Sequence, residues 1–358
     1  MQRRIQKFLI IDGSSMLSTN YYGTLPFEVL TAKTEEDKIN SYSRIMQTSD
    51  GKYTNGVFTS IKQILKMIKY QKPEGIVVVF DKTRDTFRRE IYPEYKGNRS
   101  DTPRPLKEQF ETLEQFLSDI GIPVYFSDEY EADDFAGSIA KKLESYGKDC
   151  VLISGDKDYY QLVTPHTKLW RIVTGPQKAK YEKVYNIYFD DYTRHNNFPS
   201  GIFETCYGES ILSDGIEIDL MPEQFVDFLA VVGDKADNIP GVDRVGPLTI
   251  LPLLREYGSL EKLYDVIKKA NADGTAKALA KEWKETLGVK SNPINALLAG
   301  EDKAKLSKKL ALIKTDVDTI ADNPKEYALN VDYDMFYSLA ERYEMNSLLG
   351  DIMALKNV

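Results

Sequence analysis

Three short apolar runs, each followed closely by an aspartate, place the strongest limit on what this chain can fold into. The runs, with the aspartate that follows each, are 7–11 with Asp12, 76–80 with Asp81, and 150–153 with Asp156. Unbroken runs rich in β-branched residues predict strands buried on both faces of a parallel sheet. Ligands of such sheets bind at the carboxyl ends of the strands. The sequence therefore predicts three acidic side chains on one rim of a sheet.

Helical patterns alternate with these runs and predict an α/β, doubly wound domain. Apolar residues recur at helical spacing over 57–70, 106–120 and 135–143, and the last of these helices is expected to end at Gly147. Residues 174–220 lose this periodicity and are interpreted as a connection or an insertion. Helices are predicted at 222–232, 248–256 and 259–269, with a turn-rich segment between the first two. We therefore expect an α/β domain over 1–180, a connection over 181–220 and a helical region over 221–358.

Composition narrows the chemistry that the chain can perform. Only two histidines and two cysteines occur, each isolated, against 55 acidic residues. Imidazole catalysis, zinc sites and a disulfide framework are therefore disfavoured, whereas hard carboxylate oxygens suit Mg²⁺ or Mn²⁺. The apolar stretch near the N-terminus is too short for a signal peptide, and no run approaches the length of a bilayer span. We expect a cytoplasmic protein, in a bacterial or phage-infected cell, with no membrane partner.

Acidic clusters add to the three aspartates and bring the candidate ligands to nine. Alone, each cluster is as well explained by helix N-terminal acids or a solvated loop. Together, they predict two divalent ions that activate water and hold a phosphodiester. The nine carboxylates are those of Asp12, Asp81, Glu131, Asp133, Asp134, Asp156, Asp158, Asp234 and Asp237.

A basic window lies over residues 82–107 of this acidic chain. It contains eight basic and four acidic residues, a net charge of +4, whereas the whole chain carries −8. Phe87, Tyr92 and Tyr95 lie among these charges. The segment suits a nucleic-acid backbone with stacked bases, and the alternative is a solvated charged loop.

Seven motifs, in order, resemble the 5′-nuclease superfamily, which includes the 5′→3′ exonuclease domain of bacterial DNA polymerase I, stand-alone 5′ nucleases and flap endonucleases. The resemblance implies a parallel-sheet, PIN-like (Rossmann-like) nuclease core with a helical arch at about 82–107. It also implies a helix–three-turn–helix at about 221–260 that grips duplex DNA. Residues 337–351 resemble the last helix of that domain, and a stand-alone form is expected. The motifs are Asp12-Gly13-Ser14-Ser15, Phe80-Asp81, Phe87-Arg88-Arg89-Glu90, Glu94-Tyr95-Lys96-Gly97-Asn98-Arg99, Tyr130-Glu131-Ala132-Asp133-Asp134, Gly155-Asp156-Lys157-Asp158 and 233–241.

The resemblance also implies roles for individual residues. Asp81, Glu131 and Asp133, supported by Asp12 and Asp134, serve the first ion. The second ion is served by Asp156, Asp158, Asp234 and Asp237. Lys96 and Arg88 contact the scissile phosphate. The expected DNA contacts are Arg84, Arg89, Arg99, Tyr21 (or its neighbour Tyr22), Asn238, Gly241, Arg244, Gly246 and Thr249.

Two segments depart from the family pattern. The usual Gly-hydrophobic-Gly is Arg244-Val245-Gly246 here, and Pro247-Leu248-Thr249 replaces the basic residue that normally follows. The departure argues against a K⁺ ion that the family turn can hold through carbonyl oxygens. Tyr21 and Tyr22 lie near the place of a common arginine, and a buried tyrosine is as good an explanation as a stacking one.

The expected activity is phosphodiester hydrolysis that leaves a 5′-phosphate and a 3′-hydroxyl. The expected substrates are DNA with a 5′ flap or 5′ end and RNA–DNA hybrids, in primer removal or repair, and the protein is expected to be a monomer. Three alternatives stay open. They are a ribonuclease of a related small fold, a phosphatase, and a non-catalytic DNA-binding protein built on the same fold. The basic window and the helical region weigh against the first two, and the complete set of nine carboxylates weighs against the third.

Overall fold

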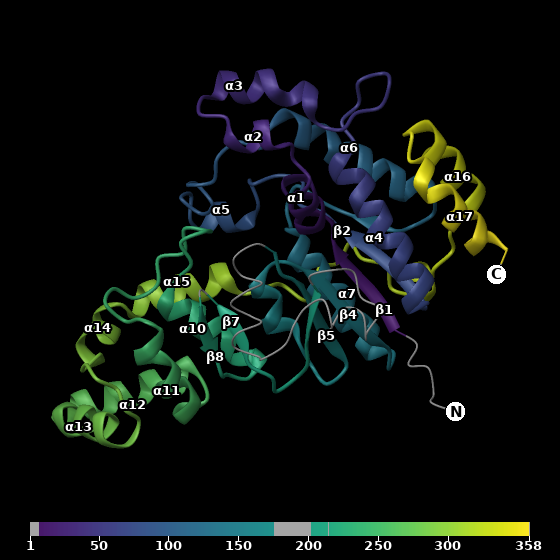
Figure 1. Cartoon of the computed structure of the whole chain (residues 1–358). Coiled ribbons are helices and arrows are strands. Elements are labelled where there is room, and N and C mark those ends of the chain that lie inside the picture. The colour runs from purple at the N-terminus through teal and green to yellow at the C-terminus, as the bar shows by residue number, and fades with distance from the viewer. Residues whose placement is uncertain (1–6, 175–201, 214, 358) are drawn as a thin grey trace.

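A six-stranded sheet forms the centre of the molecule in the computed structural model, which describes residues 7–174, 202–213 and 215–357 (Figure 1). The strand order is β3-β2-β1-β4-β5-β6; all neighbours are parallel except β5 and β6, which are antiparallel. The strands are β1 (Lys7–Asp12), β2 (Gly75–Val79), β3 (Val124–Tyr125), β4 (Asp149–Ser154), β5 (Thr167–Ile172) and β6 (Ile202–Thr205). The three predicted strands are β1, β2 and β4, and they are adjacent in the sheet.

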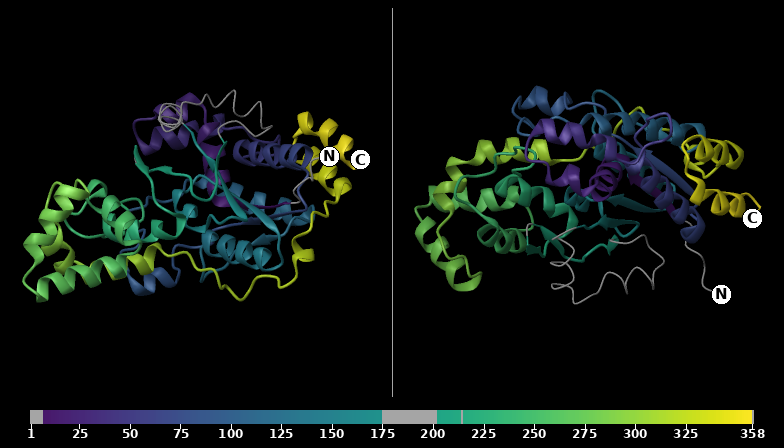
Figure 2. Two further views of the ribbon diagram at one scale, coloured as in Figure 1. Left: turned by 90° about the horizontal axis from the view of Figure 1, so that it is seen from below. Right: turned by 45° about the horizontal axis from the view of Figure 1, so that its top comes forward.

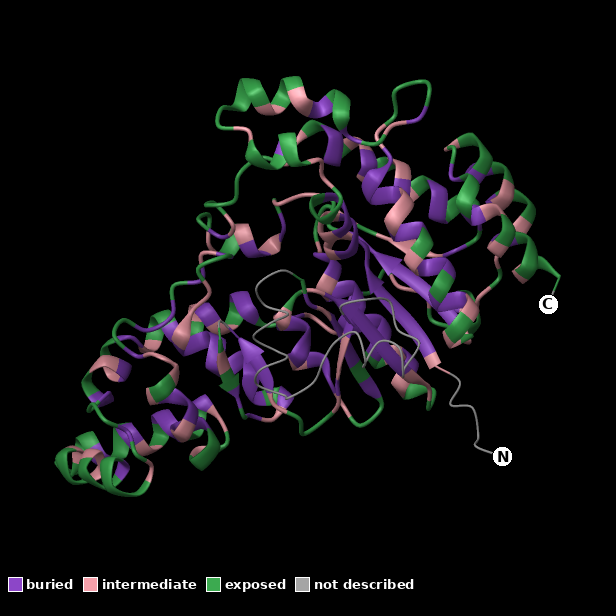
Figure 3. Ribbon diagram, viewed as in Figure 1, coloured by how far each residue is buried: buried purple, intermediate pink, exposed green. Residues whose placement is uncertain are grey.

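Alternate residues of each central strand enter different cores, which explains why the apolar runs are unbroken. Phe8 and Ile10 of β1 join a core with α7 (Ala132–Ser145) and the helical region. Leu9 and Ile11 join a second core on the opposite face, with α1 (Gly13–Gly23), α4 (Asn55–Gln71) and α6 (Arg104–Asp119). The sheet is accordingly buried throughout its centre (Figure 3). A strand covered on both faces has no solvent-facing side, so polar alternation is lost.

The helices of the nuclease core confirm the predicted pattern. The second core is covered by α1 (Gly13–Gly23), α4 (Asn55–Gln71) and α6 (Arg104–Asp119). Between α1 and α4 lies an insertion with α2 (Phe27–Thr31), α3 (Glu35–Asn40) and η1 (Ser41–Arg44). Two helix starts matter for function, because Asp12 caps α1 and a Glu131–Asp134 capping box begins α7.

The helical region projects from one end of the sheet, opposite to the C-terminal helices (Figure 2). Within this region, α10 (Phe225–Val232) packs against α15 (Glu301–Ala311). The region begins after a small hairpin of β7 (Ile211–Ser213) and β8 (Ile216–Ile218). The predicted helices at 222–232, 248–256 and 259–269 are all present. The elements are β7 (Ile211–Ser213), β8 (Ile216–Ile218), η3 (Pro222–Gln224), α10 (Phe225–Val232), α11 (Pro247–Tyr257), α12 (Leu260–Ala272), α13 (Ala276–Thr286), α14 (Ile294–Ala299) and α15 (Glu301–Ala311).

The end of the chain returns to the nuclease core. After η4 (Pro324–Tyr327), helices α16 (Tyr333–Arg342) and α17 (Leu349–Lys356), separated by η5 (Asn346–Leu348), pack against α4 and α6. From the sequence, these residues are grouped with the helical region, and one helix is expected over 337–351. The structure corrects both points, because the apolar faces of α16 and α17 belong to the second core.

Two further segments differ from expectation. The basic window is mainly turns and loop, with one short helix, α5 (Phe87–Ile91), before α6 begins at Arg104. In the expected connection 181–220, β6 adds an antiparallel edge strand and β7–β8 form a hairpin, while 181–201 and 214 lie outside the described residues.

In the part of the chain that the structure describes, no helix is long and apolar enough to cross a membrane.

Candidate active site

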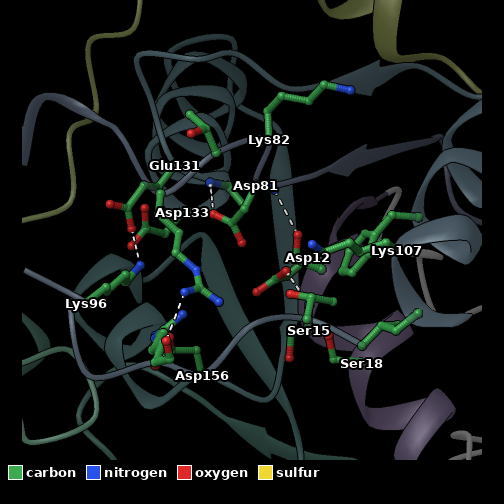
Figure 4. Close-up of a pocket in the computed structure, with 18 of the residues that line it drawn as sticks. Asp12, Ser15, Ser18, Asp81, Lys82, Lys96, Lys107, Glu131, Asp133 and Asp156 are labelled. Atoms are coloured by element: carbon green, nitrogen blue, oxygen red, sulfur yellow. Dashed lines mark hydrogen bonds and ion pairs between the residues drawn. The ribbon is translucent and has the colours of Figure 1, made fainter. Parts of the chain in front are cut away.

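A pocket of about 1080 Å³ opens at the carboxyl ends of β1, β2 and β4. Five of the nine predicted ligands line it, and Figure 4 shows these side chains around one space with Lys96 at its side. The lining acids are Asp12, Asp81, Glu131, Asp133 and Asp156. They come from three strand ends and the start of α7, so the predicted convergence on one rim is confirmed.

Serine side chains hold the strand-end aspartates in place. Asp12 Oδ1 accepts a hydrogen bond from the Ser15 amide (2.8 Å), and its Oδ2 accepts one from Ser154 Oγ (2.7 Å). The Asp81 amide donates to Ser14 Oγ (2.8 Å). The Asp156 amide donates to Ser154 Oγ (3.0 Å), so Ser154 bridges two of the acids. No role is predicted for these serines from the sequence, although Ser14 and Ser15 belong to the first motif.

Burial and like charge make this cluster costly in the absence of cations. Burial, followed by the charge of Asp81, raises the pKa of Asp12 to about 7. Burial, followed by the charge of Asp156, raises the pKa of Asp158 to about 8. Burial and the neighbouring Asp134 raise the pKa of Asp133 well above its ordinary value. A positive ion at the cluster would remove this penalty.

Two buried carboxylate oxygens in the cluster accept no hydrogen bond from any residue that the structure describes. They are Oδ1 of Asp133 and Oδ1 of Asp158. An unsatisfied buried oxygen is unfavourable, and carboxylate oxygens are the ligands that Mg²⁺ and Mn²⁺ prefer. The donor set therefore fits hard divalent cations.

Basic side chains already neutralise part of the acidic set. The Lys96 ammonium pairs with Glu131 and lies 3.7 Å from Asp237 Oδ2. Lys157 pairs with Asp234, and Arg99 pairs with Asp237. Although burial opposes the shift, Lys96 lowers the pKa of Glu131. Within the described residues, no group of three or more acidic, histidine or cysteine side chains is preassembled as a metal-binding cluster.

The predicted second-ion set divides in the structure. Asp156 lines the pocket, and its Oδ1 accepts a hydrogen bond from the Asp158 amide (2.9 Å). Asp234 and Asp237 come from the turn after α10 and do not line the pocket. Asp234 pairs with Lys157, whose ammonium also lies 3.6 Å from Asp158 Oδ1, and Asp237 lies beside Lys96, which lines the pocket. Lys157 thus connects Asp234 to Asp158, whereas Lys96 connects Asp237 to Glu131.

Arg88 lies outside the pocket, in contrast to the expected phosphate contact. Its side chain is 1 % exposed, and its guanidinium makes two hydrogen bonds with Asp134, of 2.7 and 2.8 Å. It also donates to the carbonyls of Leu310 (3.0 Å) and Leu312 (3.1 Å) at the end of α15. Asp134 is likewise fully buried, so this structure gives the pair a structural role in place of phosphate and metal contacts.

The arch contributes Arg84 and Arg99 to the pocket lining, together with Lys96. Arg84 donates to the carbonyl of Arg99 (2.9 Å), which braces the arch internally. Arg89 points away, pairs with Asp85 and does not line the pocket.

Tyr21 and its neighbour Tyr22 have different surroundings. Tyr21 is 1 % exposed and belongs to the second core, so it offers no face to a base. Tyr22 is 49 % exposed and lines the pocket. The structure therefore supports the buried-tyrosine alternative for Tyr21 and leaves Tyr22 accessible.

The predicted duplex contacts lie in and after the turn that follows α10. Arg244 is exposed, whereas Gly246, which caps the start of α11, and Thr249 are half-buried. The amide of Gly241 is buried and donates to Ser307 Oγ (2.9 Å). The Asn238 amide group donates to the carbonyl of Glu94 (2.7 Å), a contact with the arch.

Comparisons with known proteins agree with this architecture. Residues 7–189 match the family model of the 5′-3′ exonuclease N-terminal resolvase-like domain, and 220–332 match that of the 5′-3′ exonuclease C-terminal SAM fold. DNA polymerase I of Streptococcus pneumoniae is 33 % identical over 310 residues, which are 87 % of this chain and 28 % of the polymerase, so the chain spans under a third of that relative. A 5′-3′ exonuclease of Buchnera aphidicola is 30 % identical over 312 residues, covering 86 % of this chain and 87 % of that protein. The fold is that of a T5 protein co-crystallised with metal ions, with a TM-score of 0.51 at 20 % identity, over 98 % of this chain and 99 % of that one. This chain is therefore a member of the 5′-3′ exonuclease family.

Proposed function

We propose that this chain is a divalent-metal-dependent nuclease that hydrolyses phosphodiester bonds of DNA at 5′ ends and at flap junctions. The observation that carries the proposal is the convergence of Asp12, Asp81, Glu131, Asp133 and Asp156 with Lys96 in one pocket. The names of the Buchnera relative, a 5′-3′ exonuclease, and of the metal-bound T5 protein support it.

The acids that line the pocket would hold Mg²⁺ or Mn²⁺. We propose two ions, one at Asp81, Glu131 and Asp133 with Asp12, and one between Asp156 and the group of Asp158, Asp234 and Asp237. When bound, such ions lower the pKa of a water nucleophile and stabilise the charge on phosphate oxygens. Two oxygens suit this purpose: Asp133 Oδ1, and Asp158 Oδ1, which accepts no hydrogen bond from the described residues and lies 3.6 Å from the Lys157 ammonium.

Lys96 is the residue that we propose to act on the phosphate. Its ammonium borders the pocket beside Glu131, and Glu131 keeps it protonated by raising its pKa against the effect of burial. A fixed cation at this place favours the additional negative charge of a pentavalent transition state. Arg84 and Arg99, which also line the pocket, would hold neighbouring phosphates of the same strand.

The proposed substrate class rests on two surfaces beside the pocket, the basic arch and the turn with Arg244. The arch carries positive charge over the pocket, and we propose that a 5′ single strand passes beneath it. The surface with Arg244 and Gly246 would meet the duplex through backbone amides and charge, without reading sequence. On the same reasoning we propose RNA–DNA hybrids as further substrates.

Cleavage of an end-labelled 5′-flap DNA tests the function directly. We expect cutting at the junction with Mg²⁺, none with EDTA, and none by Asp156→Asn, which should still bind the substrate. Asp149→Asn is the matched control, because Asp149 begins the same strand, β4, at the end away from the pocket. Binding without cutting in Mg²⁺ or Mn²⁺ would refute the nuclease and favour a non-catalytic DNA-binding protein.

A further inference from the structure

Two turns from distant parts of the chain bind each other through reciprocal asparagines. The Asn98 amide group, in the arch, donates to the carbonyl of Lys235 (2.6 Å). The Asn238 amide group, in the turn after α10, donates to the carbonyl of Glu94 (2.7 Å). Each turn therefore supplies one asparagine to the backbone of the other. We call this pair of contacts the asparagine clasp.

The clasp encloses the backbone of Lys96. The Lys96 amide donates to the carbonyl of Asp237 (2.9 Å), between the two asparagine contacts. Lys96 has a φ of 53° and Asn238 a φ of 57°, both in the left-handed region. Asparagine adopts this region readily, but lysine does so with a steric penalty. The left-handed Lys96 backbone is thus stabilised by a hydrogen bond that its amide donates to the other turn.

Charged side chains of the two turns also lie close together. The Lys96 ammonium pairs with Glu131 of the nuclease core and lies 3.7 Å from Asp237 Oδ2 in the turn after α10. Arg99, one turn further along the arch, also pairs with Asp237. The direction in which Lys96 enters the pocket therefore depends on where the turn after α10 lies.

We propose that Asn98 and Asn238 are positioning residues for the reaction, which set the place of Lys96 by fastening the arch to the turn after α10. That turn leads directly into the surface with Arg244 and α11, so duplex bound there also orders the arch. The proposal rests on the proposed function, since it assigns Asn98 and Asn238 a role in that reaction. It also revises the expectation that Asn238 contacts DNA.

Steady-state cleavage of a 5′-flap DNA tests the positioning role. We expect Asn98→Ala and Asn238→Ala each to lower kcat about tenfold, with KM and melting temperature nearly unchanged, because both side chains hold the turns around Lys96 and, although Asn98 lines the pocket, both bond to backbone carbonyls and not to pocket acids. The double variant should fall little further than either single one, since both changes open the same clasp. Asn357→Ala is the matched control, because Asn357 also donates to a backbone carbonyl, that of Met353, but at the far C-terminus. The proposal would be overturned if the single variants kept the wild-type kcat, or if KM rose while kcat stayed unchanged.

Amide hydrogen exchange gives a second measurement that does not depend on catalysis. In the wild type, peptides over 92–99 and 233–241 should exchange slowly, and a blunt duplex without a flap should slow 92–99 further. In Asn238→Ala, 92–99 should exchange faster, and the effect of the duplex on it should disappear. Unchanged exchange of 92–99 in this variant would refute the clasp. A wild type that cuts no substrate, but shows the expected exchange, would instead refute the proposed function and retain the clasp.

Discussion

Replacing Arg88 distinguishes the role that the sequence predicts for it from the one that the structure gives. Arg88 and Asp134 are both buried, and the guanidinium makes two hydrogen bonds with the carboxylate and two more with backbone carbonyls of α15. In Arg88→Met the carboxylate loses its counter-charge but remains buried. Removing one partner of a buried ion pair typically costs about 3–5 kcal/mol. We therefore expect the free energy of unfolding to fall by about that amount.

The assay is urea denaturation followed by circular dichroism, with two companion variants. Arg88→Met combined with Asp134→Asn should recover part of the loss, because the buried charge is gone; the recovery is incomplete, since the new amide oxygen can accept only one of the two hydrogen bonds that the amides of Glu131 and Lys314 donate to the two Asp134 oxygens. Arg89→Met is the control on the same helix, and its exposed pair with Asp85 predicts a change of about 0–1 kcal/mol. The reasoning is refuted if Arg88→Met unfolds like the wild type but cuts poorly, which is the behaviour of a phosphate contact.

Three further predictions test the site and the fold. Lys96→Ala should slow cleavage by about 10²–10³-fold with nearly unchanged duplex binding, measured by single-turnover kinetics and anisotropy, and equal losses in both would contradict its catalytic role. Mg²⁺ should raise the melting temperature of the wild type, with about 2.7 kcal/mol gained at a hundred times its Kd. Asp133→Asn should be more stable without metal and gain less from Mg²⁺, because one unpartnered like charge is removed; an equal gain in both proteins would exclude Asp133 as a ligand. Gly75→Ala should cost about 1–3 kcal/mol of stability, because its Cβ would lie 2.0 Å from the carbonyl of Tyr327, whereas Gly350→Ala meets no atom within 4 Å and should not destabilise; equal melting temperatures for these two variants would disprove the close contact.

The expected effect of Mg²⁺ on stability depends on the balance between buried acidic charge and the lysines that neutralise part of it. Burial raises the pKa of Asp12 and Asp133, so their ionised forms destabilise the metal-free fold at neutral pH. Elsewhere in the acidic set, Lys96 neutralises the charge of Glu131, and Lys157 neutralises that of Asp234. Bound cations would offset the remainder, which is why the expected gain in stability is tied to the acids and can be measured without substrate.

The sequence by itself determined the three central strands, six of the helices and the rim on which the strand-end acids meet. Strand polarity follows chain direction, so an aspartate placed after each of β1, β2 and β4 must reach the same edge once these strands are parallel neighbours. Burial on both faces was visible as unbroken apolar runs, and helix periodicity predicted α4, α6, α7, α10, α11 and α12. These are local properties, in which a short window of residues carries the whole signal.

Only the tertiary structure decided what each charged side chain faces. Arg88 meets the carbonyl of Leu310, 222 positions away, and Lys96 meets the turn at Asp237. The antiparallel β6 and the return of α16 and α17 to the core were equally hidden. In each case the partner is brought in by packing between segments that no local window contains, and a basic residue in a basic segment gives no sign of whether it will face solvent, substrate or a buried carboxylate. The sequence therefore predicts which residue types gather at the site. The three-dimensional contacts decide which charged side chains face the pocket, which position others and which are structural.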